Sequence, residues 1–549
     1  MRDGVRLAID ETTVYRAFMA TAARFPDRPF VGVLEETARY YGVSAGEITY
    51  DAMASDVAAL RERYAAGGYA LGQRVGLLLE NRPVFFLHWL ALNALGVSVV
   101  PINPDLKSTE LEYLVAHSEM IAAVVIAQRQ NDINSAAKAG GRNVAVSGPD
   151  DTPKPIGARR EPAGAPDTDT ECALLYTSGT TGRPKGCVLT NTYYLNSGRW
   201  YLTVGGLITL EDGTERMLTP LPLFHMNAMA TSSMTMIMSG GCLMVLDRFH
   251  PKTWWRSVAE SRASIVHYLG VMPPMLMGAP ASDDDRAHKV RFGFGAGVDR
   301  RLHAAFEERF GFPLLEAWAM TETGGGVVIA ASRGPRHVGT SCFGRLGPES
   351  EARIVDENGV DIAADTPGQL LVRRAGPDPR HGFFREYLKD RVASEAAWAG
   401  GWFHTGDIVR RDAQGSFYFV DRKKNIIRRS GENISAVEVE SVLLQHPVVA
   451  AAAVGAVADS VRGDEVFVCI VPRSQPVDPA AAREMAVAVT RHCLDRLAYY
   501  KAPGFIAFVP SLPLTSTQKI QRGQLKDLID KIAGGEDVVD LRAMKKRGA

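Results

Sequence analysis

The chain has 549 residues, 46% of them hydrophobic and 23% charged, and its formal net charge at pH 7 is zero. This length exceeds what a single hydrophobic core usually organises, so we expect two or more domains. The balanced charge argues against a general nucleic-acid binder and against a protein held at an anionic membrane by charge.

The cysteines and the termini indicate the compartment. The six cysteines form no CxxC pair and no metal-ligand spacing, which suits a reducing environment. The first residues lack the apolar run of a signal peptide, and no lipidation signal ends the chain. The most apolar stretch, residues 84–97, contains His88 and Asn93 and is too short to span a bilayer. We therefore expect a cytoplasmic protein with no transmembrane segment.

The first two-thirds of the chain alternate short apolar runs with helical patterns. Continuous apolar strands separated by helix-length spacers predict an α/β fold with mostly parallel sheets covered by helices. A helix is expected over residues 83–95, and strands are expected at 75–80, 97–102, 173–176, 243–246, 265–269, 290–294 and 314–318. Residues 148–170, rich in Pro, Gly and Asp, are interpreted as a surface loop rather than a domain linker.

The pattern changes after Gly344. Strands expected at 352–355, 369–373 and 416–420, with turns at Asn358-Gly359 and Gln414-Gly415, indicate a small β-rich subdomain. From about residue 424 a smaller α+β pattern follows, with helices expected at 437–444 and 480–497 and strands at 448–454, 466–471 and 505–509. We predict a large N-terminal domain at 1–423 and a small mobile C-terminal domain at 424–549.

The loop from Tyr176 to Gly186 has the residue types that hold a polyphosphate. Glycines let the backbone approach closely, so that N–H groups converge on oxygen anions, while hydroxyls and a lysine add donors and charge. The spacing is not that of a P-loop, because Gly182 and Lys185 are three apart and Gly186 follows the lysine. A surface loop rich in turn residues is the plainer alternative, but the order of these residues favours phosphate binding. The candidate phosphate ligands are Thr177, Ser178, Gly179, Thr180, Thr181 and Lys185.

This loop and several later motifs resemble those of the adenylate-forming superfamily, which includes acyl-CoA synthetases, peptide-synthetase adenylation domains and beetle luciferases. The resemblance covers about residues 175 to 520, in the family's order. Its further motifs are Pro222-Leu223-Phe224-His225, Gly295-Ala296-Gly297, Glu316-Ala317-Trp318-Ala319-Met320-Thr321-Glu322, Gly401-Trp402-Phe403-His404-Thr405-Gly406-Asp407, Asp421-Arg422-Lys423-Lys424-Asn425, Ser430-Gly431-Glu432-Asn433-Ile434-Ser435 and Pro513-Leu514-Thr515-Ser516-Thr517-Gln518-Lys519-Ile520.

The resemblance implies a nucleotide site at the end of an apolar strand, where open α/β sheets bind ligands. Trp318 would stack on adenine where the family usually has Tyr, and Thr321 would contact phosphate. Asp407 would accept from the ribose hydroxyls, with Arg422 near ribose or phosphate. Glu322 would hold Mg²⁺, which favours carboxylate oxygens. The remaining nucleotide-binding candidates are Gly295, Ala296, Gly297, Glu316 and Ala317.

Lys519 is the strongest catalytic candidate. Adenylation brings together two anions, the carboxylate and the α-phosphate, so catalysis must come mainly from positioning and from cationic stabilisation. A solvated lysine is the plainer alternative. The resemblance places the adenylation lysine here, although Gln518 stands where the family normally has Gly.

Lys424 matches the family's hinge between the two domains, and such a hinge lets one site serve two half-reactions. Gly431 would border the thiol tunnel, and Arg428 would lie near the second half-reaction, where the family often has Lys. Asn425 replaces a frequent Asp.

His225 would lie at the acyl pocket, near the reacting carboxylate, although a core or gate residue is the plainer alternative. Ala319 stands where Gly is common, which weighs against bulky aromatic acids. For most of the methionines that follow His225, and for Trp200 and Tyr201, core packing is the favoured interpretation. These methionines are Met226, Met229, Met234, Met236 and Met238.

The residues 428–435 and the Thr-rich final motif are most similar to the carnitine/crotonobetaine-CoA ligase-like branch, with a short or medium aliphatic or unsaturated acid as substrate. The resemblance implies an ATP-dependent ligase that uses Mg²⁺ and passes the acyl group from an acyl-adenylate to coenzyme A. It leaves a homodimer possible. The alternative is a stand-alone enzyme that loads a carrier protein. A third interpretation is a non-catalytic nucleotide-binding protein. Against it stand the intact candidate residues Lys185, Glu322, Asp407, Arg422 and Lys519.

Overall fold

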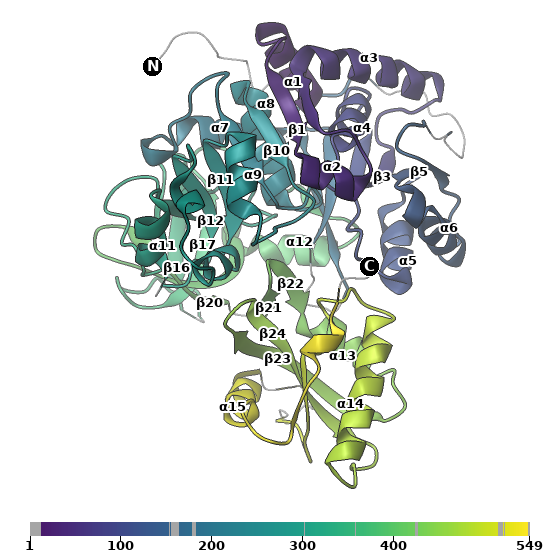
Figure 1. The fold of residues 1–549 in the computed structure, drawn as a ribbon, viewed down its shortest axis with the longest axis vertical. Coiled ribbons are helices and arrows are strands. Elements are labelled where there is room, and N and C mark those ends of the chain that lie inside the picture. Colours follow the sequence, from purple (N-terminus) through teal and green to yellow (C-terminus); the bar gives the residue numbers. More distant parts are fainter. Residues whose placement is uncertain are drawn as a thin grey trace. The chain divides into compact units, whose positions relative to one another are not determined.

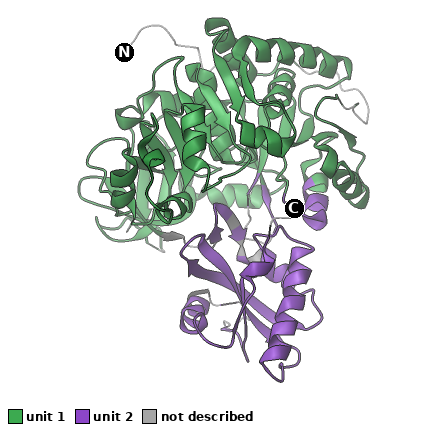
Figure 2. Cartoon of the chain, in the orientation of Figure 1, with its two compact units in different colours: residues 1–104, 115–175, 186–421 green, residues 105–114, 176–185, 422–549 purple. Residues whose placement is uncertain are grey.

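The computed structural model describes residues 12–152, 154, 164–177, 183–300, 302–356, 358–422, 426–513, 520 and 522–546. The chain forms two compact units (Figure 2), and unit 1 comprises residues 1–104, 115–175 and 186–421. Unit 2 comprises residues 105–114, 176–185 and 422–549. The predicted division into 1–423 and 424–549 stays a prediction. The surface loop expected at 148–170 falls partly on residues outside the described ranges.

The longest sheet runs parallel from β1 through β10, β9, β11 and β12 to β13, as expected for apolar strands buried on both faces. Beyond β13 the pairing with β14 and β15 is antiparallel, and this part is the predicted β-rich subdomain. In spatial order the strands are β16 (Ser350–Val355), β17 (Gly368–Arg374), β19 (Phe403–Arg411), β20 (Ser416–Arg422), β15 (Cys342–Arg345), β14 (Ile329–Ala330), β13 (Leu314–Trp318), β12 (Phe292–Ala296), β11 (Ile265–Leu269), β9 (Arg216–Thr219), β10 (Cys242–Val245), β1 (Pro29–Val33) and β2 (Gly46–Thr49).

A second sheet has parallel central strands, and its edge strand β18 pairs antiparallel with β8. This pairing joins Tyr387 to Cys187, two residues after Lys185. In spatial order the strands are β18 (Glu386–Tyr387), β8 (Lys185–Thr190), β7 (Glu171–Thr177), β4 (Ser98–Pro101), β3 (Arg74–Leu78), β5 (Ala122–Val125) and β6 (Ala145–Ser147). These sheets and their covering helices confirm the predicted α/β class (Figure 1).

The helices follow local signals in the sequence. Thr13 caps α1 by accepting from the backbone N–H of Arg16, and Asp478 caps α14 in the same way ahead of Pro479. Among the described residues, no helix combines the length and the apolar character that crossing a membrane requires. The helices are α1 (Val14–Arg24), α2 (Glu35–Tyr41), α3 (Tyr50–Ala66), α4 (Val84–Asn93), α5 (Ser108–Ser118), α6 (Gln130–Ala139), α7 (Asn191–Thr203), α8 (Ser233–Ser239), α9 (Trp254–Ser261), α10 (Met272–Met277), α11 (His303–Phe310), α12 (Arg391–Ala397), α13 (Ala436–Leu443), α14 (Pro479–Leu494) and α15 (Arg522–Ile532).

Unit 2 has a sheet with a hydrophobic core on each face. Successive residues of a strand point to opposite faces, so Val468 and Ile470 pack under α13 and α14, whereas Phe467 and Cys469 pack under α15. Figure 1 shows α14 and α15 on opposite sides of the β23–β24 pair. Its strands are β21 (Ile426–Arg429), β22 (Glu432–Ser435), β23 (Val449–Asp459), β24 (Gly463–Pro472), β25 (Phe505–Phe508) and β26 (Val538–Asp540).

Two charged clusters are buried in unit 2. In the first, Lys501 Nζ lies 2.6 Å from Glu110 Oε1 and 2.8 Å from Glu438 Oε1, and Glu110 also accepts from the N–H of Ala498 at 3.0 Å. Burial opposes the charge on Lys501, but the two carboxylates outweigh it and raise the pKa of Lys501 above its ordinary value. The cluster therefore joins the segment 105–114 to α13 and to the chain after α14 through one cation.

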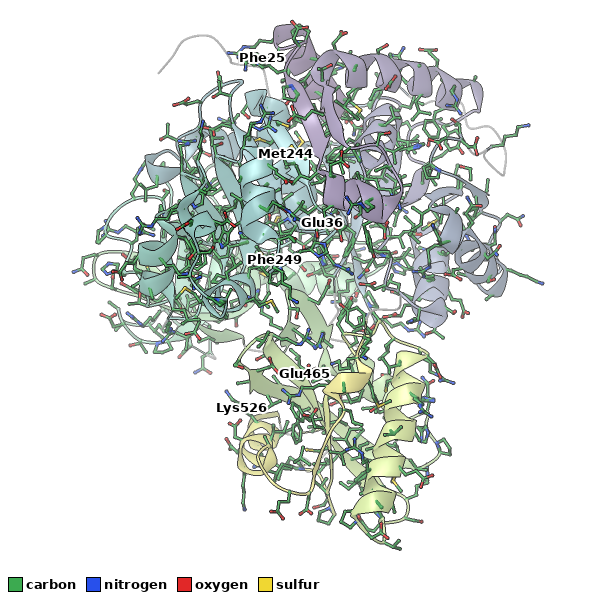
Figure 3. The ribbon with its side chains drawn as sticks, viewed as in Figure 1. Phe25, Glu36, Met244, Phe249, Glu465 and Lys526 are labelled. Atoms are coloured by element: carbon green, nitrogen blue, oxygen red, sulfur yellow. The ribbon has the colours of Figure 1, made fainter. Side chains whose placement is uncertain are left out.

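The second cluster centres on Glu465, labelled in Figure 3. Arg429 Nε donates to Glu465 Oε2 at 2.8 Å, and Lys545 Nζ contacts Glu465 Oε1. Gly504 leaves room for this carboxylate, because a Cβ there would lie 2.4 Å from Glu465 Cγ. All three side chains are buried, so two basic groups share one carboxylate inside unit 2.

Burial, followed by the neighbouring Arg429, lowers the pKa of Lys545 from 10.5 to about 7. Between these values the unfolded chain binds a proton that the folded chain has released, so the free energy of unfolding of unit 2 should rise with pH. We expect a gain of about 1–2 kcal/mol between pH 7.5 and 9, since each pH unit contributes at most about 1.4 kcal/mol. The free energy of unfolding at each pH can be measured by urea unfolding. Hydrogen exchange of peptides from β23 and β24, pulsed at one fixed pH, monitors the unfolding.

The variant Lys545→Met should remove this pH dependence, whereas Lys531→Met, at an exposed lysine of α15, should leave it intact. A flat profile in the unmodified chain over pH 7.5–9 would show that Lys545 keeps an ordinary pKa.

Candidate nucleotide and acyl site

The turn after β12 lies at the carboxyl end of the parallel strands. Gly297 has φ +80°, and a Cβ on Gly295 would lie 2.2 Å from the backbone oxygen of Tyr268. Both glycines are therefore required by the backbone itself. The adjacent strand β13 is parallel to β12 and places Glu316 opposite Gly295. The two predicted motifs, 295–297 and 316–322, thus lie side by side where ligands bind in such sheets.

Glu316 holds this turn in place. Its two carboxylate oxygens accept from the N–H groups of Gly297 and Val298, each at 2.9 Å. Burial raises the pKa of Glu316, and these two donors act against that rise. The structure thus gives the Glu316 side chain a positioning contact, and its predicted contact with the nucleotide stays a prediction.

Trp318 and Asp407 meet although 89 positions separate them in the sequence. Trp318 is the last residue of β13 and Asp407 lies on β19; the indole Nε1 donates to Asp407 Oδ2 at 2.8 Å. Both side chains are buried, and the N–H of Asp407 donates to Thr405 Oγ1 at 3.0 Å. The predicted adenine-stacking and ribose-binding residues are therefore joined directly. A tyrosine ring lacks the indole N–H that makes this contact.

Glu322 follows β13 and is oriented by Tyr387. The Tyr387 hydroxyl donates to Glu322 Oε1 at 2.9 Å, and the N–H of Phe384 donates to the Glu322 backbone oxygen at 2.9 Å. Burial and the nearby Glu322 raise the pKa of Tyr387, so the hydroxyl remains a donor. The structure places no cluster of three or more metal-ligating side chains within its described ranges. A carboxylate held in this way still suits Mg²⁺, which completes its coordination with substrate phosphates and water.

The backbone before His225 is fixed by Asn81, a residue outside the predicted motifs. Asn81 Nδ2 donates to the backbone oxygens of Leu221 and Leu246 at 2.9 and 2.8 Å, and Asn81 Oδ1 accepts from the N–H of Leu223 at 2.9 Å. His225 itself is half-buried, with its ring 4.6 Å from that of Phe224. The sequence signal for this role is an asparagine just after an apolar strand, because a buried amide there needs hydrogen-bond partners.

The chain after His225 forms a π-helix at Asn227–Ser232, which continues into α8. π-Helical turns are rare in proteins, and those that do occur are frequently found at functional sites. Met229, Met234, Met236 and Met238 are buried, in keeping with core packing. Tyr201 is fully buried and packs on Phe294, as does Trp200.

The hairpin of β21 and β22 carries two predicted residues in unit 2. Arg428 is exposed, and its backbone N–H donates to Asp464 Oδ2 at 2.9 Å. Ser430 and Gly431 form the turn, with φ values of +51° and +88°. Gly431 thus has a conformational reason to be glycine.

Of the remaining predicted site residues, some are described by the structure and others are not. Thr177 ends β7 and Lys185 begins β8, and both are half-buried on neighbouring strands. Thr321 and Ala317 are also half-buried, and Ala317 pairs with Ala330. The predicted residues whose placement or side chain is not described are Ser178, Gly179, Thr180, Thr181, Arg422, Lys424 and Lys519.

Comparison with known proteins agrees with this geometry. The model of the AMP-binding enzyme family matches residues 18–388, and that of the AMP-binding enzyme C-terminal domain matches residues 438–519. The chain belongs to the AMP-binding enzyme family. Membership confirms the predicted adenylate-forming superfamily and the predicted enzyme class, an AMP-forming acid–thiol ligase.

Curated relatives of this family member extend over most of its length. A crotonobetaine/carnitine–CoA ligase of Shigella flexneri is 30% identical over 475 residues, covering 84% of this chain and 89% of the relative. A sulfoacetate–CoA ligase of Cupriavidus necator is 30% identical over 512 residues, covering 92% of this chain and 95% of the relative.

Solved structures share the family fold. An o-succinylbenzoate CoA synthetase of Bacillus subtilis superposes with a TM-score of 0.80 at 24% identity, over 94% of this chain and 99% of that one. An amide bond synthetase of Marinactinospora thermotolerans gives a TM-score of 0.78 at 22% identity, over 94% and 99% of the two chains.

Proposed function

We propose that this AMP-binding enzyme is an ATP-dependent acyl-CoA ligase acting on a short or medium carboxylic acid. The observation that supports it most is the meeting of Trp318 and Asp407 beside the turn that Glu316 holds. An aromatic ring at the carboxyl end of a parallel strand, joined to a carboxylate, suits the binding of an adenosine. The adenylate-forming motifs and the CoA-ligase relatives point to the same activity.

In the first half-reaction a carboxylate oxygen attacks the α-phosphorus of ATP, and the bond to pyrophosphate breaks. Thr177 to Thr181 and Lys185 bind the phosphates, while Trp318 and Asp407 fix the adenosine. Lys519 bridges the carboxylate and the α-phosphate and stabilises the charge that develops there. Glu322 would hold Mg²⁺, and the bound ion would neutralise phosphate charge.

In the second half-reaction the thiol of coenzyme A loses its proton and attacks the acyl carbon, and AMP leaves with the bonding electrons. We assign this step to a second arrangement of the C-terminal domain, reached by rotation at Lys424, with Gly431 and Arg428 facing the thiol. One site then serves both half-reactions in turn. Mg²⁺ use, a cytoplasmic location and a homodimer belong to this proposal.

A screen of carboxylic acids tests the function by acid-dependent release of pyrophosphate from ATP, with and without coenzyme A. We expect release with short acids, and a thioester together with AMP when coenzyme A is present. Acyl-adenylate trapped by hydroxylamine without any CoA thioester would favour the carrier-protein alternative. An absence of release across the whole panel would contradict the proposed function.

A further inference from the structure

A buried polar network lies under the π-helix that follows His225. His267, on β11, is fully buried. Its Nδ1 lies 2.9 Å from Asn227 Oδ1 and 2.9 Å from Ser232 Oγ, and its Nε2 lies 3.2 Å from the Tyr201 hydroxyl. The Ser232 hydroxyl also lies 3.1 Å from the backbone oxygen of Asn227. The network thus connects β11, α7 and both ends of the π-helix.

One arrangement of protons satisfies every buried member of the network. Tyr201 donates to His267 Nε2, His267 Nδ1–H donates to Asn227 Oδ1, and Ser232 donates to the backbone oxygen of Asn227. With the opposite tautomer the Tyr201 hydroxyl would face an N–H and have no acceptor in a fully buried place, which is costly. Burial also lowers the pKa of His267 to about 3, so the ring is neutral at physiological pH.

This arrangement fixes the orientation of the Asn227 amide. Its Oδ1 accepts from His267, so its Nδ2 must point the other way. Asn227 is half-buried, and its side chain contacts His267 Nδ1 and Ser232 Oγ, in both cases through Oδ1. Asn227 stands two positions after His225, at the first position of the π-helix. The side chain is therefore a donor held in one orientation, two positions after the residue that the family resemblance assigns to the acyl pocket.

We propose that Asn227 Nδ2 donates a hydrogen bond to the acid substrate, and that His267 is the positioning residue that fixes this donor. The inference rests on the proposed function and deepens it. The preferred acid then carries a hydrogen-bond acceptor near its carboxylate, such as a hydroxyl, a carbonyl or a second acidic group. An apolar acid of the same shape leaves the donor without a partner, and such sites reject it strongly.

The test compares two acids of nearly equal shape, 3-hydroxybutyrate and 3-methylbutyrate, by the kcat/KM of pyrophosphate release. We expect the unmodified enzyme to prefer the hydroxy acid by about tenfold, which is near the upper end of what one hydrogen bond contributes. Asn227→Leu should reduce the preference to below about threefold, through a lower kcat/KM for the hydroxy acid alone.

Variants of His267 separate positioning from general packing. His267→Phe keeps an aromatic ring beside Tyr201 but loses Nδ1–H, so the preference should fall although Asn227 is intact. His267→Asn keeps a hydrogen-bond donor near the position of Nδ1, so this variant should retain the preference for the hydroxy acid. Tyr194→Phe, which removes a hydroxyl 3.3 Å from Met229 Sδ, is the matched control and should leave the preference unchanged. The ratio is internal to each preparation, so loss of folded protein does not alter it.

Pyrophosphate release with an equal acid preference in the unmodified enzyme and in Asn227→Leu would overturn the inference while leaving the ligase function standing. A preference of the unmodified enzyme for 3-methylbutyrate would also overturn the inference and leave the ligase function standing. Absence of release with any acid would instead contradict the proposed function, and the inference with it.

Discussion

Lys519→Ala is expected to lower the rate of acyl-adenylate formation by about 10³-fold, because removing one preorganised cationic or hydrogen-bonding group from a developing charge commonly costs 10²–10³. The same variant should convert supplied acyl-adenylate and coenzyme A to thioester within about threefold of the normal rate. The two half-reactions separate because Lys519 is assigned only to the arrangement that adenylates. Pyrophosphate release measures the first rate, and single-turnover thioester formation measures the second.

Lys531→Ala is the control for this variant, since Lys531 is an exposed lysine in the same unit. It should leave both rates unchanged. Equal losses in the two half-reactions of Lys519→Ala would contradict the assignment of separate arrangements. An unchanged adenylation rate would remove Lys519 from the catalytic residues.

Lys501→Met is expected to destabilise unit 2 by about 3–5 kcal/mol, the usual cost of removing one partner from a buried ion pair. It leaves the Glu110 and Glu438 carboxylates facing each other without their shared cation. Urea unfolding followed by hydrogen exchange of α13 and β24 peptides measures the loss. Glu438→Gln added to Lys501→Met should recover about half of it or more, because one carboxylate charge is then gone.

The control variant Lys531→Met makes the same lysine-to-methionine substitution at an exposed position. It should shift the free energy of unfolding by less than about 0.5 kcal/mol. If Lys501→Met were as mild as this control, the two carboxylates would not depend on Lys501. If the double variant were as unstable as the single one, the loss would come from packing rather than from charge.

Local patterns in the sequence predicted most strands and helices to within a few residues, because apolar runs and helical periods are local properties. The strands at 265–269 and 314–318 are observed as expected, and the helix expected at 83–95 is α4, Val84–Asn93. The change from parallel to antiparallel pairing at β14 was not predicted at residue level. That strand, Ile329–Ala330, is too short to give a pattern.

The candidate site was predicted where its residues form motifs, and missed where they depend on distant neighbours. The motifs predict both Trp318 and Asp407 as site residues, but a single sequence does not predict their direct contact. Asn81 acts on backbone groups about 140 positions away, and Tyr387 reaches Glu322 only because β18 pairs with β8. Tertiary pairing gives such residues their roles, and one sequence does not reveal it.

The burial of all six cysteines makes the chain convenient for fluorescence labelling. A maleimide dye needs an accessible thiolate, so the native thiols should react slowly while the protein is folded. Cysteines introduced at Val392, 79% exposed in unit 1, and at Val477, 90% exposed in unit 2, would accept a donor and an acceptor dye. Energy transfer between them, compared with ATP and acid bound and then with coenzyme A added, would follow the proposed rotation one molecule at a time.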